Sequence, residues 1–318
     1  MNFNIRVKTS ISGGMMHRSA LYVPGDHDRA MAKAASLDAD ILIFDLEDGV
    51  APVQKPKARE AIGSHFSHSP LEGESNSRQA NSEGGNADLP HPPTPSLMGR
   101  GSLKCIRINH RDTPYYADDL AALSSLNLDG IMLSKVGGPD EIDHALSQLA
   151  QHHRGDLPIW CNVETPLGVT NCEAIAAHPA VRGLVAGTND LANDLRIRLT
   201  PDRAGLLHSL QRLLLAGRAH GCIMLDGTFV DLADEVGLRA EAEQGRTLGF
   251  DGKTLIHPKQ VAIANEVFGI TKEERGEAKA IIEAYEAAMA ENKAVALLNG
   301  RMIEALHYER AKATLSTT

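Results

Sequence analysis

The sequence is poor in aromatic residues and has no long apolar run. Aromatic side chains make up 4% of its 318 residues, against 42% hydrophobic residues in all, so aliphatic side chains must build the core. No apolar stretch reaches the roughly eighteen residues that a membrane helix needs, so we expect no membrane partner. Residues 1–16 contain no apolar segment typical of a secretory signal, and we expect them to form a flexible leader.

Positive charge and cysteine pairs are also scarce. Lys and Arg number 32 against 41 Asp and Glu, which gives a formal net charge of −9. Proteins that bind nucleic acid usually carry a basic face, so we expect no nucleic-acid partner. No two cysteines form a C-x-x-C pair, and we expect buried, reduced thiols in a cytoplasmic protein. The four cysteines are Cys105, Cys161, Cys172 and Cys222.

One internal segment differs from the rest in composition. Between positions 67 and 102, 20 of 36 residues are Ser, Gly, Pro or Asn, and none is aromatic, Val or Ile. Such a segment cannot bury enough apolar surface to offset the entropy lost on ordering. We therefore interpret 67–102 as a disordered, low-complexity insertion that loops into solvent.

The remaining sequence alternates short apolar runs with amphipathic helical stretches. Near-continuous apolar strands separated by helices are typical of a parallel sheet, and eight such units indicate a (β/α)8 TIM barrel. We expect this α/β catalytic barrel to span 17–270. A doubly wound sheet is the structural alternative, although no G-x-G-x-x-G motif follows the first run. The eight runs are 18–25, 39–48, 103–110, 128–136, 157–166, 181–190, 222–231 and 250–258.

Residues 271–318 follow the eighth run and lie beyond the barrel. A strong helical pattern leads to a turn at Asn299-Gly300 and then to a second helix. We expect this C-terminal helical extension either to cap its own barrel as a lid or to reach a neighbouring subunit.

Charged and polar residues occur where the predicted strands end. In a barrel of this class the chemistry lies at the C-terminal ends of the strands. These positions gather about six carboxylates against few cations, an excess that favours a divalent metal held by oxygen ligands, Mg²⁺ or Mn²⁺. The strand-end residues are Asp45, Glu47, Asp48, Arg107, Asn109, Lys135, Glu164, Asp190, Asp226 and His257.

Each of these residues also has a structural interpretation. Glu164 precedes Thr-Pro and would suit the start of a helix, and Asp190 would suit an N-cap. Lys135 would simply pair with an acid. Arg107, however, stands between two isoleucines in an apolar strand, and charges in such places seldom serve stability. Together the residues favour a functional site over separate structural roles.

Several motifs carry a resemblance to a known family. The stretches "RSALYVPGDHDRAMAKAASLDADILIFDLEDGVAPVQKPKAREA", "IRIN", "ETPLGVTNCEAIA" and "LIHPKQV" resemble the citrate lyase beta-subunit-like family. That family belongs to the malyl-CoA lyase and citramalyl-CoA lyase superfamily. The resemblance covers the chain apart from the leader and 67–102. It implies a barrel with a C-terminal extension, a homotrimer or hexamer, and one Mg²⁺ per active site.

The resemblance also implies roles for particular residues. Glu164 in "ETP" and Asp190 in "GTNDL" match the metal ligands. Arg107 in "RIN" matches the arginine that holds the oxygen of a 2-oxo acid. Glu47 and Asp48 in "DLED" match acids that bind waters on the metal. For substrate contacts we add the strand-end residues Pro24, Gly25, Lys135 and His257 to Arg107.

The extension departs from the family pattern at one position. Lyases of the family carry an Asp in a motif like "GxMID", delivered by a neighbouring subunit as the acid or base on the acetyl-CoA carbon. Here "NGRMIEAL" places Glu304 at that position, with a side chain one methylene longer. We expect Glu304 to take the same role.

The leading hypothesis is therefore a carbon–carbon lyase. It would cleave a citramalyl-, malyl- or citryl-CoA thioester to acetyl-CoA and a 2-oxo acid, with Mg²⁺ and Arg107 polarising the substrate oxygens. Four alternatives remain open at this point. They are an aldolase acting on pyruvate or oxaloacetate with free aldehydes, a malyl-CoA thioesterase, the beta subunit of a citrate lyase complex acting on a carrier-bound thioester, and a non-catalytic relative.

Overall fold

The structure is a computed structural model that describes residues 16–67, 102–152 and 154–316. The predicted leader 1–16 and the predicted insertion 67–102 lie outside these residues, apart from Met16, Ser67 and Ser102. Both of those interpretations stay predictions.

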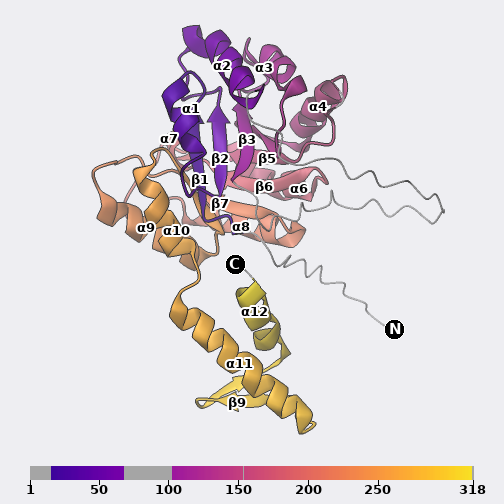
Figure 1. The fold of residues 1–318 in the computed structure, drawn as a ribbon, viewed down its shortest axis with the longest axis vertical. Helices are drawn as coiled ribbons and strands as arrows, with labels where there is room; N and C mark the ends of the chain where they lie inside the picture. Colours follow the sequence, from indigo (N-terminus) through magenta and orange to yellow (C-terminus); the bar gives the residue numbers. More distant parts are fainter. Residues whose placement is uncertain (1–15, 68–101, 153, 317–318) are drawn as a thin grey trace, which may run out of the picture.

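Eight parallel strands close into a barrel in sequence order, and β8 pairs with β1 (Figure 1). This confirms the predicted (β/α)8 fold and excludes the doubly wound sheet. Each strand falls within one of the apolar runs. The strands are β1 Ser19–Pro24, β2 Ile41–Asp45, β3 Leu103–Ile108, β4 Gly130–Leu133, β5 Ile159–Val163, β6 Val181–Ala186, β7 Ile223–Asp226 and β8 Gly252–Leu255.

Helices follow the strands and form the outer layer of the barrel. Two short 3₁₀ helices, η1 Pro52–Gln54 and η2 Leu123–Ser125, accompany them. The barrel helices are α1 Asp28–Ala34, α2 Lys55–Ser67, α3 Tyr116–Ala122, α4 Pro139–Ala150, α5 Pro166–Thr170, α6 Cys172–Ala177, α7 Thr188–Asp194, α8 Leu207–His220, α9 Glu235–Leu248 and α10 Lys259–Phe268.

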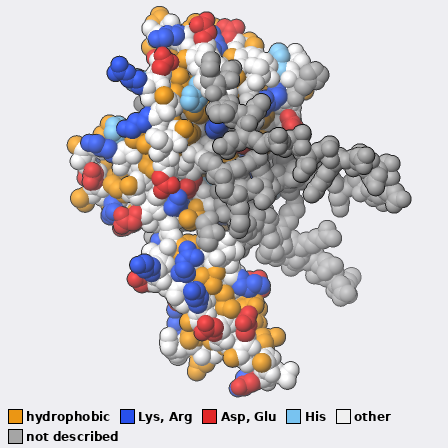
Figure 2. Space-filling view, in the orientation of Figure 1, with side chains coloured by type: hydrophobic (Ala, Val, Ile, Leu, Met, Phe, Trp, Pro, Cys, Tyr) orange, Lys and Arg blue, Asp and Glu red, His pale blue; other side chains and the backbone are white. Residues whose placement is uncertain are grey.

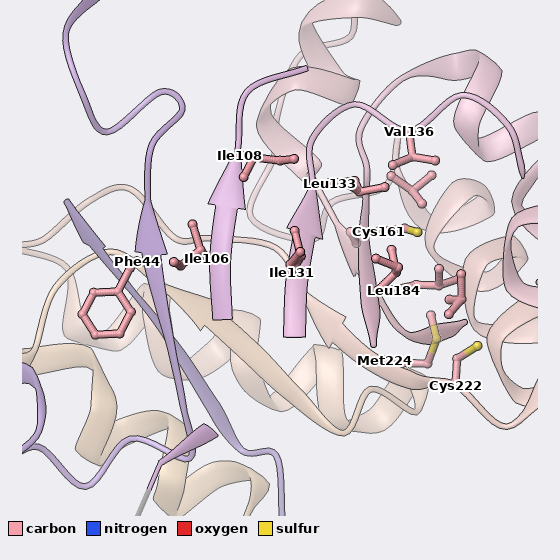
Figure 3. Packing of buried hydrophobic residues seen from close by; sticks show 14 of the residues in the cluster. Phe44, Ile106, Ile108, Ile131, Leu133, Val136, Cys161, Leu184, Cys222 and Met224 are labelled. Carbon is pink, nitrogen blue, oxygen red and sulfur yellow. The ribbon is translucent and has the colours of Figure 1, made fainter. Parts of the chain in front are cut away.

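The strands are apolar on both faces because both faces are buried. Side chains such as Phe44, Ile106 and Ile131 pack outward against the helices (Figure 3). The alternate positions, among them Ile43 and Trp160, fill the inside of the barrel. A strand that is covered on both sides reads as a continuous apolar run, which explains why the sequence pattern predicted these strands well.

The four cysteines are all buried and unpaired, as predicted. Burial raises the pKa of the Cys222 thiol to about 11, so it is protonated at neutral pH. Among the described residues, no helix combines the length and the apolar character that a bilayer span requires.

The extension contains a helical hairpin and a small sheet that the sequence pattern did not predict. Helix α11 (Lys272–Ala290) begins with a capping box formed by Thr271 and Glu274. Strands β9 (Ala296–Leu298) and β10 (Arg301–Ile303) pair across the predicted Asn299-Gly300 turn, where both φ angles are positive. Helix α12 (Ala305–Ser316) then packs back on α11.

This extension stands apart from the barrel (Figure 1). Hydrophobic side chains appear on its surface in Figure 2. In the extension, Leu297, Met302 and Leu306 are 75%, 59% and 75% exposed. The expected contact with a neighbouring subunit stays a prediction.

Candidate active site

A pocket of about 380 Å³ lies at the C-terminal ends of the strands. Because all eight strands are parallel, the residues that follow them meet at this one rim. Most of the lining residues are polar. The polar lining residues are Tyr22, Asp45, Asp48, Arg107, Asn162, Glu164, Thr188, Asn189, Asp190, Thr228 and Thr254.

Glu164 follows β5 directly and is 5% exposed. Its Oε1 accepts a hydrogen bond from the Lys135 backbone N–H (2.9 Å), and its Oε2 accepts one from Asn162 Nδ2 (2.6 Å). Burial, together with the negative charge of Glu47, raises its pKa to about 8. The alternative helix-capping role is wrong, because Thr165 caps α5 by accepting from the Gly168 N–H.

Asp190 lies in the first turn of α7, after β6. The N-cap of that helix is Gly187, so the alternative N-cap role for Asp190 is also wrong. A Cβ on Gly187 would lie 2.2 Å from Glu164 Cβ and 2.6 Å from its Oε2. The absence of a side chain at Gly187 therefore lets this loop approach Glu164, and it brings Asp190 to the same pocket.

Arg107 of β3 is fixed by carboxylates on both sides of its guanidinium. Its Nε and Nη2 donate to the two oxygens of Asp45 at 2.7 and 2.6 Å, and its Nη1 lies 2.9 Å from Glu47 Oε2. The Tyr22 ring lies 4.4 Å from the guanidinium carbon. Burial acts against the charged form of Asp45, but Arg107 and backbone hydrogen bonds outweigh it and lower the pKa of Asp45. Arg107 thus stays charged and oriented, with N–H donors left for a ligand.

Lys135 joins the acids of two different strands. Its Nζ lies 3.2 Å from Asp190 Oδ2 and 3.7 Å from Glu47 Oε1. Its backbone adopts a positive φ of 54°, which is uncommon for a residue other than glycine. In this conformation the backbone N–H of Lys135 donates to Glu164. Lys135 therefore contacts acids of the site with both its backbone and its side chain.

The residues at the mouth fit a hard divalent cation. Carboxylates outnumber cations here by five to two, and burial raises the pKa of Glu47 although Arg107 opposes the rise. The described residues contain no cluster of three or more His, Cys, Asp or Glu that would enclose a metal alone. Mg²⁺ is usually held by one or two carboxylates and keeps waters or substrate oxygens. The carboxylates are Asp45, Glu47, Asp48, Glu164 and Asp190, and the cations are Arg107 and Lys135.

Four other predicted site residues divide between the pocket and its surroundings. Pro24 lines the pocket, whereas Gly25 packs behind it, where a Cβ would lie 2.8 Å from the Asp45 carbonyl oxygen. His257 is next to the lining residue Ile256 and accepts from the Lys259 N–H. Glu304 precedes α12 and does not line the pocket of its own chain. Their predicted roles stay predictions.

The ring of strand-end acids is smaller than expected, because Asp226 does not belong to it. The Asp226 side chain is fully buried and pairs with Arg203 at 2.8 Å and with Lys253 at 3.6 Å. Lys253 in turn contacts Glu241 at 2.6 Å. Asp226 is therefore part of a balanced internal ion network under the mouth.

Sequence reasoning missed Asn162, a polar residue of the pocket. Trp160 and Asn162 alternate along β5 and Glu164 follows at the next position of the same alternation, so Asn162 lies on the inward face of the strand, next to Glu164. An amide two residues before a predicted metal ligand, on the same face of an apolar strand, was the available signal.

Comparison with known proteins places these features in a family. The model of HpcH/HpaI aldolase/citrate lyase matches residues 18–75 and 96–258. A second model, described as a C–C bond lyase of the TIM-barrel fold, matches residues 208–318.

Individual relatives agree with the family models. A (3S)-malyl-CoA thioesterase of Cereibacter sphaeroides is 41% identical, and the match covers 94% of this chain and 93% of that protein. The citrate lyase subunit beta of Escherichia coli is 29% identical over 94% of this chain and 92% of its own. A structure of CitE from Mycobacterium tuberculosis with magnesium, acetoacetate and coenzyme A has a TM-score of 0.70 at 26% identity, covering 96% of this chain and 98% of that one. The chain belongs to the HpcH/HpaI aldolase/citrate lyase family and is an enzyme of the carbon–carbon lyase class.

Proposed function

We propose that this protein is a Mg²⁺-dependent lyase that cleaves a malyl-, citramalyl- or citryl-type CoA thioester to acetyl-CoA and a 2-oxo acid. The observation that carries the proposal is that Glu164, Asp190 and Arg107 face one pocket. The similar CitE structures support it, because one contains magnesium, acetoacetate and coenzyme A and another contains oxaloacetate and magnesium.

Glu164 and Asp190 would hold the metal, with Glu47 and Asp48 accepting hydrogen bonds from waters around it. When bound, Mg²⁺ supplies Lewis-acid polarisation of the substrate oxygens and lowers the cost of negative charge on them. The Glu164 carboxylate accepts one hydrogen bond on each oxygen, from the Lys135 backbone N–H and from the Asn162 amide.

Arg107 would bind the oxygens of the 2-oxo acid portion. Two of its N–H groups are committed to Asp45, which fixes the plane of the guanidinium and aims the remaining donors. A charge fixed in this way stabilises the oxygen on which negative charge develops without reorganising during the reaction.

The bond changes balance with one proton. The substrate hydroxyl would give its proton to the carboxylate of Glu47 or Asp48, its oxygen would become the carbonyl oxygen of the 2-oxo acid, and the adjacent carbon–carbon bond would break. Its electron pair stays with the acetyl-CoA fragment as an enolate. Glu304 of a neighbouring subunit would then protonate that carbon, within the roughly 2.6–3.2 Å that proton transfer requires.

A second candidate is thioester hydrolysis, which the (3S)-malyl-CoA thioesterases at 40–41% identity favour. In that reaction water adds to the thioester carbonyl, the carbon–sulfur bond breaks, and malate and free CoA result. Both candidates use the same pocket, metal and Arg107, so the products distinguish them.

The deciding experiment is a Mg²⁺-dependent assay on malyl-CoA and (S)-citramalyl-CoA that follows 2-oxo acid and free thiol separately. Oxo acid without thiol supports the lyase, thiol without oxo acid supports hydrolysis, and both together indicate hydrolysis coupled to cleavage. We expect Glu164→Ala to abolish turnover, whereas Glu173→Ala, an exposed position on α6, serves as a matched control. Full activity of Glu164→Ala would contradict the metal assignment.

Two further properties follow the same proposal. We propose a homotrimer or hexamer, since the apolar surface of the extension stands away from its own barrel. The buried, unpaired cysteines support a reducing compartment, and we propose the cytoplasm.

A further inference from the structure

Asn162 places an amide at the bottom of the pocket, next to the apolar interior of the barrel. The side chain is 3% exposed, and the preceding inward residue, Trp160, belongs to the apolar cluster inside the barrel. Burying an amide there costs free energy unless its polar atoms are hydrogen-bonded. A leucine of similar size would fill the space without that cost, so stability does not explain the amide.

The Asn162 amide makes one strong contact, and that contact is with Glu164. Its Nδ2 donates to Glu164 Oε2 at 2.6 Å, while the Lys135 backbone N–H donates to Oε1 at 2.9 Å. The carboxylate is therefore fixed by a donor on each oxygen. Both donors leave lone pairs of the carboxylate free for a cation, because each oxygen has two.

The second polar atom of the amide has no partner. Asn162 Oδ1 is buried and accepts no hydrogen bond, although the side chain lines the pocket. With Glu164 ionised, as a metal ligand is, only an NH₂ group can donate to it, so the unpartnered atom of the amide is the oxygen. A missing Cβ at Gly187 keeps the space beside it open, because that carbon would lie 3.2 Å from Oδ1. An unsatisfied acceptor at such a place points to a polar ligand in the pocket.

We propose that Asn162 is a positioning residue for the metal site, which orients the Glu164 carboxylate toward the cation. This inference rests on the proposed function, since it takes Glu164 as a metal ligand. It adds a residue outside the ligand set whose loss weakens metal binding without unfolding the barrel. Hydrogen-bond partners of metal ligands typically change metal affinity about 10- to 100-fold when they are removed.

The test is Mn²⁺ binding to the full chain, followed by the EPR signal of the free ion. We compare wild type with Asn162→Leu, which removes the amide at nearly constant volume, and with Asn162→Ala. We expect both variants to bind Mn²⁺ about 10- to 100-fold more weakly. Thermal unfolding, measured on the same samples, should retain its cooperative transition.

Asn265→Leu is the matched control. Asn265 on α10 is also a buried asparagine with an unpartnered Oδ1, but its Nδ2 donates to Asp38, away from the pocket. We expect this variant to lose stability and to keep the wild-type Mn²⁺ affinity.

The outcomes separate this inference from the proposed function. If Glu164→Ala loses Mn²⁺ binding while Asn162→Leu and Asn162→Ala keep wild-type affinity, the positioning role is wrong and the metal site stands. If both Asn162 variants lose cooperative unfolding, Asn162 is a structural residue and the inference fails. If wild type binds no Mn²⁺, the proposed function fails and this inference with it.

Discussion

At the scale of single residues, the site depends on a glycine as much as on its charged groups. Glu164 and Asp190 follow the neighbouring strands β5 and β6, and they reach one pocket because the loop at Gly187 passes directly over Glu164. The φ angle at Gly187 is −79°, which other residues also adopt, so backbone conformation does not require the glycine. The glycine is required because a side chain at position 187 would occupy the space into which Glu164 packs.

We predict that Gly187→Ala impairs catalysis, although alanine can adopt the φ angle of this position without strain. The added carbon would meet Glu164 Cβ at 2.2 Å, so either the loop or the carboxylate must shift. A displacement near 1 Å at a reacting centre costs about 100-fold in rate, and we expect a loss of that order in kcat/KM. Gly276→Ala on α11, where a new Cβ meets no atom within 4 Å, is the control and should keep full activity. Equal kinetics for the two variants would show that the loop tolerates the methyl group.

The sequence predicts the charged part of this site better than its neutral part. Glu164, Asp190 and Arg107 stand out because a charge at the end of an apolar strand needs a physical reason. Asp45 was recognised as a strand-end acid, but its pairing with Arg107 depends on the register of β2 against β3, which sets Asp45 beside Arg107. Asn162 carries no charge, and its importance becomes visible only with its contact to Glu164.

At the scale of elements, β7, β8 and α9 are joined by buried charges rather than by apolar packing alone. Asp226 ends β7 in register with Lys253 of β8, and both side chains are fully buried. Lys253 reaches Glu241 of α9 and the Gly227 carbonyl, and Asp226 accepts from Arg203 and from the Gly227 N–H. The network thereby holds the Gly227 loop, which leads to the pocket residue Thr228.

We predict that Lys253→Met destabilises the barrel strongly. The substitution keeps the aliphatic stem but leaves Asp226 and Glu241 with Arg203 alone in a buried setting. Removing one partner of a buried ion pair typically costs about 3–5 kcal/mol, and we expect a loss in that range. Urea denaturation would measure this loss in the free energy of unfolding, provided that the m-value is the same for the wild type and the variant. Arg239→Ala, which breaks an exposed pair with Glu266, should leave the urea midpoint nearly unchanged, and a comparable drop in both variants would contradict the argument.

Elements with strong burial were predictable, and elements with weak burial were not. All eight barrel strands fell within apolar runs because each is covered by helices outside and side chains inside. The hairpin β9–β10 has only three residues per strand, and of these Leu297 and Met302 are largely exposed. Two strands of this length contain too few alternating apolar and polar residues to be predicted from the sequence, although their Asn299-Gly300 turn was predicted.

At the scale of the whole molecule, a single chain does not bring Glu304 to its own pocket. Glu304 belongs to an extension that stands apart from the barrel, and it does not line the pocket of its own chain. The extension presents the exposed Leu297, Met302 and Leu306, which would be covered by contact with another copy. Head-to-tail contacts of this kind close into rings such as trimers when the rotation permits.

We predict that two inactive variants restore activity when they assemble together. Glu304→Ala lacks the proposed proton donor and should lose about 10²- to 10⁴-fold in rate, and Glu164→Ala lacks the metal ligand. In hybrid oligomers, an intact pocket of one chain can receive Glu304 from its neighbour. Random assembly of equal amounts gives about one productive site in four chains, so we expect about a quarter of wild-type activity.

The control for this experiment mixes Glu164→Ala with Asp190→Ala, whose defects lie in the same pocket. No hybrid of those two chains contains an intact site beyond what each alone provides, so the mixture should stay inactive. If Glu304 instead acted within its own chain, the first mixture would stay inactive too, and the extension would be a lid on its own barrel. If Glu304→Ala alone were fully active, the proton would come from another group, and the departure of this chain from the family motif would mark a different last step.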